Sequence, residues 1–158
     1  MRTPHKHIHL FITNYFPTFL RKEREERNSN AKPESCGENI LYFGCQSKNK
    51  DYIYKDELES FQNSKLLSKL YLAFSREQKE KVYVQHLLKR EPNSSDLIDY
   101  IDSGAYIYVC GATNMGTDVH ETFLSILQSK KNISRQKAET ILENLQKSGR
   151  YVQELWTA

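Results

Sequence analysis

The sequence has few cysteines, and no two of them are close together. Cys36, Cys45 and Cys110 are too widely separated to indicate a metal site or a disulfide framework. An odd number of cysteines without a signal peptide favours free thiols in a reducing compartment. The sequence also lacks any apolar run of the roughly 20 residues that a membrane-spanning helix needs. We therefore expect no metal and no membrane segment in this chain.

Charge of neither sign dominates. The chain carries 23 basic and 20 acidic residues, which leaves a net charge of +3. Because the two signs are mixed, there is no basic stripe to follow a phosphate backbone, and we expect no nucleic-acid partner. Internal repeats and low-complexity tracts are absent as well. With 158 residues and an apolar fraction of 38%, the chain is large enough for one α/β domain with a hydrophobic core.

The first 37 residues differ from the rest. Residues 1–20 hold three of the five histidines and no acidic residue. A short apolar run at 9–13 indicates a first strand, and residues 21–27 alternate in charge, which is typical of a helix with a solvated face. Residues 28–37 read as a polar linker. We therefore predict an atypical N-terminal segment over residues 1–37 and a ligand-binding domain over residues 38–158.

From residue 39 onward, strand and helix patterns alternate. Short apolar runs predict strands that are buried on both faces, and capping residues with helical spacing predict helices. The expected strands are 40–43, 70–74, 106–110 and 151–156; the expected helices are 54–61, 82–88, one capped by residues 94–96, one capped by Thr113 or Asn114, and one capped by Ser134 that ends at Gly149. This order predicts a three-layer α/β fold, an open parallel sheet with helices on both faces. Ligands bind such sheets at the carboxyl ends of the strands.

One cluster of polar residues follows the second of these strands. Ser75 and Arg76 come directly after it, and Lys81, Tyr83 and Gln85 lead into the next helix. A hydroxyl, two cations, a phenol and an amide are suited to hold a phosphate monoester beside an aromatic base. The alternative is an ordinary solvated helix start, and the residues alone do not decide between the two.

A thiol and a glycine end the third strand. Gly111 lets a ligand approach the backbone, and the helix that follows has free N–H groups for a pyrophosphate. Cys110 could face a nicotinamide ring, although most free cysteines at such positions are small buried apolar residues. Trp156, the only tryptophan, could stack on a flat ligand or anchor the last strand by packing.

Four stretches of the sequence resemble the C-terminal NADP(H)-binding domain of the diflavin reductases. That domain is of the ferredoxin-NADP reductase type, and the NADPH–haemoprotein reductase branch is the most similar. The stretches are Asn39–Cys45 with Asp51 and Tyr52; Ala73–Gln78 through Lys81–Gln85; Tyr106–Gly111 with Asn114, Met115, Asp118 and Val119; and Gly149–Trp156. The resemblance extends over residues 38–158.

The resemblance implies how the nucleotide is held. Ser75, Arg76 and Lys81 would bind the 2′-phosphate that distinguishes NADPH from NADH. The adenosine pocket would be completed by Tyr83 and Gln85. The ribose and pyrophosphate site would be shaped by Met115 and Asp118, next to Gly111.

The resemblance also implies how hydride transfer is arranged. Cys110 would line the nicotinamide site and help to position hydride transfer to FAD. Trp156 would cover the flavin ring of FAD and swing away to admit nicotinamide. Glu154 would replace the acidic residue, usually aspartate, that assists this step. The complete enzyme would add FAD and FMN domains and pass electrons to a haem protein, in the cytoplasm or at the cytoplasmic face of the endoplasmic reticulum.

The sequence departs from the family in three respects. Residues 11–19 replace a Gly-Thr-Gly loop, so the backbone cannot close on a pyrophosphate in the usual way. Ala112 stands where the family has an aspartate after Cys-Gly. No flavin domain is present in these residues, and we expect this chain alone to reduce no cytochrome. The alternative function is a noncatalytic truncated isoform or partner-binding fragment that binds nucleotide weakly.

Overall fold

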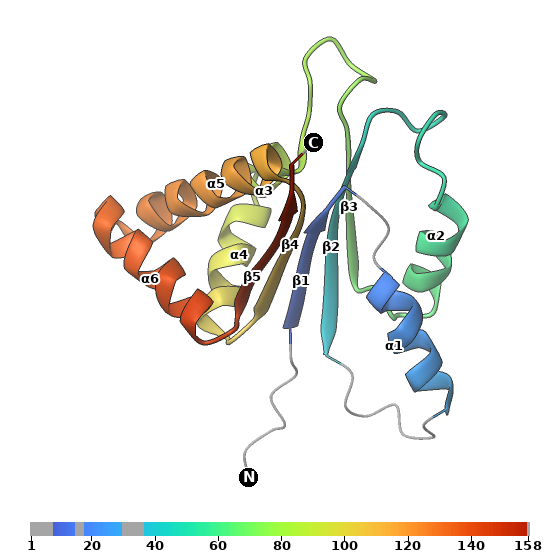
Figure 1. The fold of residues 1–158 in the computed structure, drawn as a ribbon, viewed down its shortest axis with the longest axis horizontal. Helices are drawn as coiled ribbons and strands as arrows, with labels where there is room; N and C mark the ends of the chain where they lie inside the picture. The colour runs from blue at the N-terminus through green and yellow to red at the C-terminus, as the bar shows by residue number, and fades with distance from the viewer. Residues whose placement is uncertain (1–7, 15–17, 30–36, 158) are drawn as a thin grey trace.

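The strands form one parallel sheet at the centre of the molecule (Figure 1). The computed structural model describes residues 8–14, 18–29 and 37–157. Its strands are β1 (Ile8–Thr13), β2 (Glu38–Cys45), β3 (Lys69–Phe74), β4 (Tyr106–Ala112) and β5 (Tyr151–Trp156). They lie in the order β3-β2-β1-β4-β5, and every neighbouring pair is parallel. The predicted fold class is confirmed.

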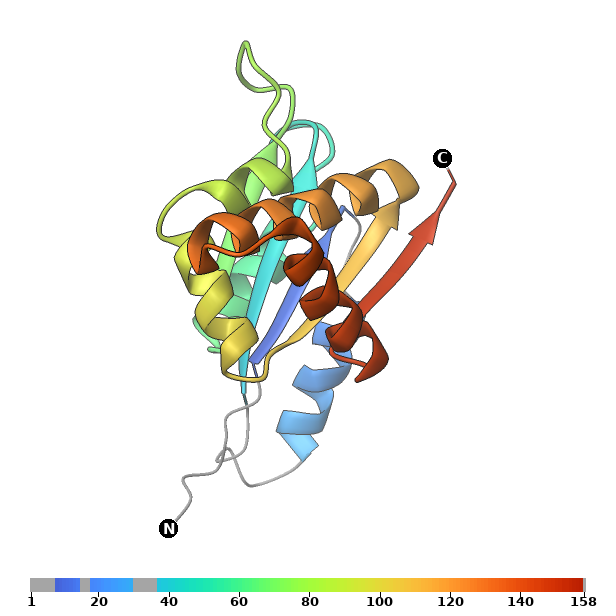
Figure 2. The same ribbon diagram turned by 90° about the vertical axis from the view of Figure 1, so that its left-hand side faces the viewer.

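Helices cover both faces of the sheet. On one face lie α1 (Thr18–Ser29) and α2 (Lys55–Asn63); on the other lie α3 (Val84–Lys89), α4 (Asn93–Asp102), α5 (Thr113–Lys131) and α6 (Arg135–Lys147) (Figures 1 and 2). Successive residues of a strand point to opposite faces of the sheet, so alternate residues belong to two separate hydrophobic clusters. Leu10 and Ile12 of β1 pack toward the four-helix side, whereas Phe11 packs with Leu20 and Leu58 on the other.

The strand predicted near the N-terminus lies in the middle of the sheet. β1 pairs with β2 on one side and with β4 on the other, so that Ile12 lies opposite both Tyr42 and Val109. After β1, the chain adds β2 and then β3 on one side of it. It then crosses to the other side of β1, where it adds β4 and β5. The boundary between β1 and β4 is therefore the point where the strand order reverses, and open α/β sheets bind ligands at this point.

Two predicted helix caps are wrong, and two helix-end predictions are confirmed. α4 begins with Pro92 as its N-cap, not a residue of 94–96, because Asn93 donates its side-chain amide back to Leu87 O and the chain turns directly out of α3. α5 follows β4 without a linker, so that Ala112 is its N-cap in place of Thr113 or Asn114. Ser134 does cap α6, accepting from Lys137 N–H. Gly149 ends α6 at φ +72°, a conformation that favours glycine.

All five strands end at the same edge of the sheet (Figure 1). Ser75, Cys110 and Gly111 therefore lie at one edge, as the sequence predicted. None of the described helices is long and apolar enough to cross a membrane. Within the described part of the chain, no cluster of histidine, cysteine and acidic residues could hold a metal ion. Cys36 and residues 15–17 of the segment that replaces the glycine loop lie outside the described residues.

Candidate functional site

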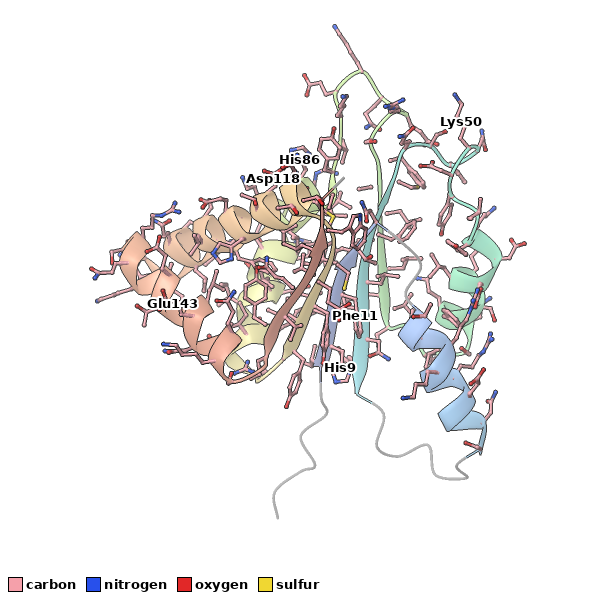
Figure 3. All side chains as sticks on the ribbon, in the orientation of Figure 1. His9, Phe11, Lys50, His86, Asp118 and Glu143 are labelled. Carbon is pink, nitrogen blue, oxygen red and sulfur yellow. The ribbon has the colours of Figure 1, made fainter. Side chains whose placement is uncertain are left out.

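A cavity of about 600 Å³ lies at the carboxyl ends of β2 and β3 and reaches the first turns of α3 and α5. This volume is within the range of pockets that hold small molecules and cofactors. Seven of the residues predicted to bind cofactor line it, namely Ser75, Arg76, Lys81, Tyr83, Gln85, Met115 and Asp118. Figure 3 labels Asp118 and His86 on one side of this end of the sheet, and Lys50 on the loop opposite.

Two loops form one wall of the cavity, and hydrogen bonds tie them together. The ladder between β2 and β3 continues past the strands, because Ser75 N–H donates to Cys45 O at 2.9 Å and Arg76 N–H donates to Gln46 O at 2.8 Å. Glu77 accepts from the N–H of Lys48 and from the hydroxyl of Ser47. Ser75 and Arg76 are thus held at fixed backbone positions beside the cavity.

The charges on this wall favour an anion. Among the described residues, no carboxylate lies within ion-pair distance of Arg76 or Lys81. The nearby carboxylate of Asp51 is already occupied, since it accepts from the N–H groups of Gln46 and Ser47 at 2.7 Å each. Burial alone would raise the pKa of Asp51, but these hydrogen bonds and the charge of Arg76 lower it below its usual range. Both cations therefore remain available to a ligand.

The first turn of α3 forms the opposite wall. Val84 packs close to Gly44, where an added Cβ would lie 3.2 Å from Val84 Cγ1. Gln85 donates from Nε2 to Asp118 Oδ2 at 3.3 Å. Its other amide atom, Oε1, is buried and has no hydrogen-bond partner among the described residues. An unsatisfied buried acceptor costs free energy, so a ligand that donates a hydrogen bond here would stabilise the site.

The start of α5 supplies a third element of the site. Its N-cap, Ala112, has no side chain that could accept from the first N–H groups of the helix. Asn114 and Met115 in this first turn line the cavity. Backbone N–H groups at a helix start attract phosphate. The first turn of α5 and the two cations line the same cavity.

The residues predicted to act in hydride transfer lie outside the cavity. Cys110 is half-buried in β4, opposite Thr13 of β1 and Glu154 of β5. Trp156 lies opposite Ala112 and is 43% exposed, and its carbonyl accepts from the Thr113 hydroxyl at 3.2 Å. The structure thus brings Cys110, Glu154 and Trp156 together at the β4–β5 end of the sheet edge, next to but separate from the cavity.

Several lining residues were not predicted. They are Asn14, Cys45, Asp51, Ile53, Tyr54 and Asn114, among others. Asn14 and Cys45 lie at or just beyond the ends of β1 and β2, so the rule that singled out Ser75 could have found them. Cys45 is a weak nucleophile here, because burial, with the charges of Asp51 and Glu77, raises the pKa of its thiol to about 11. Ile53 is 73% exposed at the rim of the cavity, and no local signal in the sequence indicates this position.

Comparison with known proteins identifies the relatives of this chain. Residues 15–121 match the oxidoreductase NAD-binding domain family. NADPH–cytochrome P450 reductase of Homo sapiens is 43% identical over 125 residues, which cover 78% of this chain and 18% of that protein. The enzyme of the same name from Salmo trutta is 44% identical over 126 residues, covering 78% and 21%. NADPH oxidoreductase A of Dictyostelium discoideum is 43% identical over 121 residues, covering 76% and 19%.

The family and the relatives agree with the parallel α/β sheet of this chain and with the location of the cavity. The chain spans about a fifth of the length of these curated relatives. The family match extends from the end of β1 into α5 and so includes every residue that lines the cavity except Asn14. The chain belongs to the oxidoreductase NAD-binding domain family and is related to cytochrome P450 reductase.

Proposed function

We propose that this chain is the NADP(H)-binding module of a flavoprotein reductase. The observation that supports this most directly is the cavity wall that holds Ser75, Arg76 and Lys81. A phosphate monoester carries up to two negative charges, and neither cation forms an ion pair with a carboxylate among the described residues. We assign this wall to the 2′-phosphate, the group that distinguishes NADPH from NADH.

The remaining polar groups of the cavity suit the adenosine. Tyr83 is 40% exposed at the cavity wall and offers an aromatic face to a base. Gln85 Oε1, the buried acceptor without a partner among the described residues, fits a ribose hydroxyl or an amino group. Asp118 accepts from Gln85 and adds an acceptor from α5. The residues present therefore fit the adenosine end of NADP(H).

The chemistry of the complete enzyme begins at the β4–β5 end. When bound, NADPH supplies a hydride. We assign to Cys110 the positioning of the nicotinamide ring. Glu154 would place a carboxylate beside this ring, and Trp156 would cover the FAD ring in a neighbouring domain. The exposure of Trp156 and Leu155, 43% and 36%, is consistent with a surface that another domain covers.

The proposal extends to partners that this chain does not contain. FAD and FMN domains would accept the hydride and pass single electrons to a haem protein such as a cytochrome P450, at the cytoplasmic face of the endoplasmic reticulum. The relatives bear the names of such reductases, and this chain matches about a fifth of their length. The alternative, a noncatalytic fragment that binds a partner through the surface around Trp156, predicts little or no nucleotide binding.

Titration with adenosine 2′,5′-bisphosphate separates the two functions. This ligand contains the 2′-phosphate, the adenosine and the first phosphate, and it needs no flavin domain. We expect isothermal calorimetry of the chain to give a Kd in the micromolar range, a binding free energy of about −8 kcal/mol. Absence of binding at millimolar ligand would reject the nucleotide-binding function and leave the noncatalytic alternative.

A further inference from the structure

The last strand of the sheet is paired along one edge only. Among the described strands, β5 has β4 as its single neighbour (Figure 2). Alternate residues of a strand point to opposite faces, so a shift of β5 by one residue against β4 would exchange its two faces. Glu154 and Trp156 share one of these faces, and both are exposed. The contacts on the other face therefore help to determine where these two side chains are held.

The other face of β5 packs against the first half of α5. Leu155 covers Gly116, where an added Cβ would lie 2.4 Å from Leu155 Cδ1. Tyr151 is buried, and its ring stacks on that of His120 with a centroid distance of 5.8 Å and an interplanar angle of 16°. Gln153 lies between these two contacts along the strand. Three successive residues of this face are thus in contact with α5.

The polar atoms of this interface form one chain of hydrogen bonds with a defined direction. Gly116 O can only accept, so the Gln153 amide presents Nε2 to it, at 3.4 Å. The same Nε2 donates to Tyr151 Oη at 3.0 Å. The proton of the Tyr151 hydroxyl is then directed to His120 Nδ1, 3.1 Å away. Because Nδ1 accepts, His120 is the neutral tautomer that carries its proton on Nε2.

The charged groups around His120 are compatible with a neutral imidazole. Among the described residues, no carboxylate lies within ion-pair distance of His120. Glu121, the next residue of α5, interacts electrostatically with His120, but both of its oxygens accept from Arg135 of α6, at 3.0 and 2.8 Å. From β5, Tyr151 faces the imidazole, and burial raises the pKa of its phenol, so this hydroxyl keeps its proton. The chain of hydrogen bonds is complete without a charged member.

We propose that His120 is a positioning residue that holds β5 against α5 by accepting the hydroxyl of Tyr151. It thereby fixes the strand that carries Glu154 and Trp156 on its opposite face. A shift of β5 by one residue would separate Tyr151 and Gln153 from their partners and leave their polar atoms unsatisfied. The consequence for hydride transfer rests on the proposed function, which assigns roles to Glu154 and Trp156, whereas the hydrogen-bond chain itself does not.

Hydrogen exchange measured by mass spectrometry tests this inference without any ligand. His120→Phe keeps an aromatic ring but has no acceptor, and Tyr151→Phe removes only the hydroxyl. In each variant we expect the amides of β5 to exchange about fivefold or more faster, which is the effect of one lost hydrogen bond. The amides of β3, the opposite edge strand, are an internal control and should stay within about twofold of their wild-type rates.

Two further variants separate the acceptor from the ring. His120→Asn places an amide oxygen close to the position of Nδ1 and should return β5 exchange to within about twofold of the wild type. Ser125→Ala, at an exposed position of α5, is the matched control and should change neither strand.

Three results would overturn the inference in variants that are folded by circular dichroism. Equal acceleration of β3 and β5 would show a contribution to global stability alone. Unchanged β5 exchange in both phenylalanine variants would show that the hydrogen bond holds nothing. Exchange in His120→Asn as fast as in His120→Phe would assign the effect to the ring. Failure of the chain to bind adenosine 2′,5′-bisphosphate would reject the proposed function, and the exchange rates would still decide the role of His120.

The tautomer of His120 gives a second readout that packing alone would not produce. Nitrogen NMR distinguishes protonated from unprotonated imidazole nitrogens, and His120→Asn identifies the signals of His120 among those of the five histidines. At about pH 8 we expect an unprotonated Nδ1 and a protonated Nε2 in the wild type, and a mixture of both tautomers in Tyr151→Phe. A proton on Nδ1 in the wild type would reverse the hydrogen bond and overturn the inference.

Discussion

Removal of the Arg76 guanidinium is the most direct test that the cavity wall with Ser75, Arg76 and Lys81 binds the 2′-phosphate. Arg76 is tied into the structure through its backbone, by the hydrogen bond from its N–H to Gln46 O. Its side chain has no ion-pair partner among the described residues, and Asp51, whose carboxylate interacts electrostatically with Arg76, keeps its hydrogen bonds from Gln46 and Ser47. Arg76→Ala should therefore fold normally and leave no buried carboxylate unpaired.

The loss of affinity follows from the interaction that disappears. A hydrogen bond to a charged group contributes about 1.5–3 kcal/mol, so NADP⁺ should bind the variant about ten- to a hundredfold more weakly. NAD⁺ has no 2′-phosphate and should lose less than about twofold. Isothermal calorimetry with both nucleotides gives the two ratios. Lys50→Ala is the matched control, because Lys50 lies on the adjacent loop but does not line the cavity.

Two results would refute this reasoning. An equal loss for NADP⁺ and NAD⁺ would place Arg76 near a group that both nucleotides share. An unchanged affinity for NADP⁺ would remove Arg76 from the site altogether. The pKa of Asp51, measured from its carboxyl signal in an NMR titration, tests the interaction with Arg76 in the absence of ligand. The charge of Arg76 helps to lower the pKa of Asp51, so this pKa should rise in Arg76→Ala and stay unchanged in Lys50→Ala.

Two further predictions concern the surroundings of the site. Since burial raises the pKa of Cys45 to about 11, its alkylation by iodoacetamide at pH 8 should be about tenfold or more slower than that of a free thiol; fast labelling in peptide mass spectra would contradict this. Arg21 donates to both oxygens of Glu57, at 2.6 and 2.8 Å, and lowers the pKa of that carboxyl. A lowered carboxyl pKa adds stability above the ordinary value of 4.5, and this stability is lost as the pH falls through the folded-state pKa. Arg21→Ala should thus lower the stability in urea unfolding only slightly at pH 7, because so exposed a pair contributes little, and not at all once Glu57 is protonated; a cost that persists in acid would point to lost packing instead.

The strands and the cavity wall that holds Ser75, Arg76 and Lys81 could be predicted because their signals are local. An apolar run followed directly by Ser75 and Arg76 identifies both a strand and the polar group at its end, within a few residues of sequence. The prediction that this strand is buried on both faces is wrong, because β3 is an edge strand and most of its side chains are only half-buried. The period of two places Leu10 and Ile12 on one face of the sheet in any strand order. Ser134 and Gly149 have side-chain or backbone properties that define a helix end without tertiary contacts.

The features that were missed depend on contacts across the fold. Pro92 and Ala112 are N-caps whose side chains make no capping hydrogen bond, so no capping side chain marked either helix start in the sequence. Asn14 is near the cavity because β1 lies between β2 and β4, and strand order cannot be derived from the pattern of a single strand. The close packing of Met115 and Asn14 against Gly111 likewise involves two segments that are far apart in the chain.

The separation of the cavity from the β4–β5 end also follows from this topology. Ser75 and Arg76 follow an edge strand of the sheet, and Trp156 ends the opposite edge strand. A dinucleotide that contacts both must cross the ends of β2, β1 and β4, and the last two are the strands beneath Asn14 and Gly111. The sequence predicts both ends of this path because each consists of a strand end and its own neighbours.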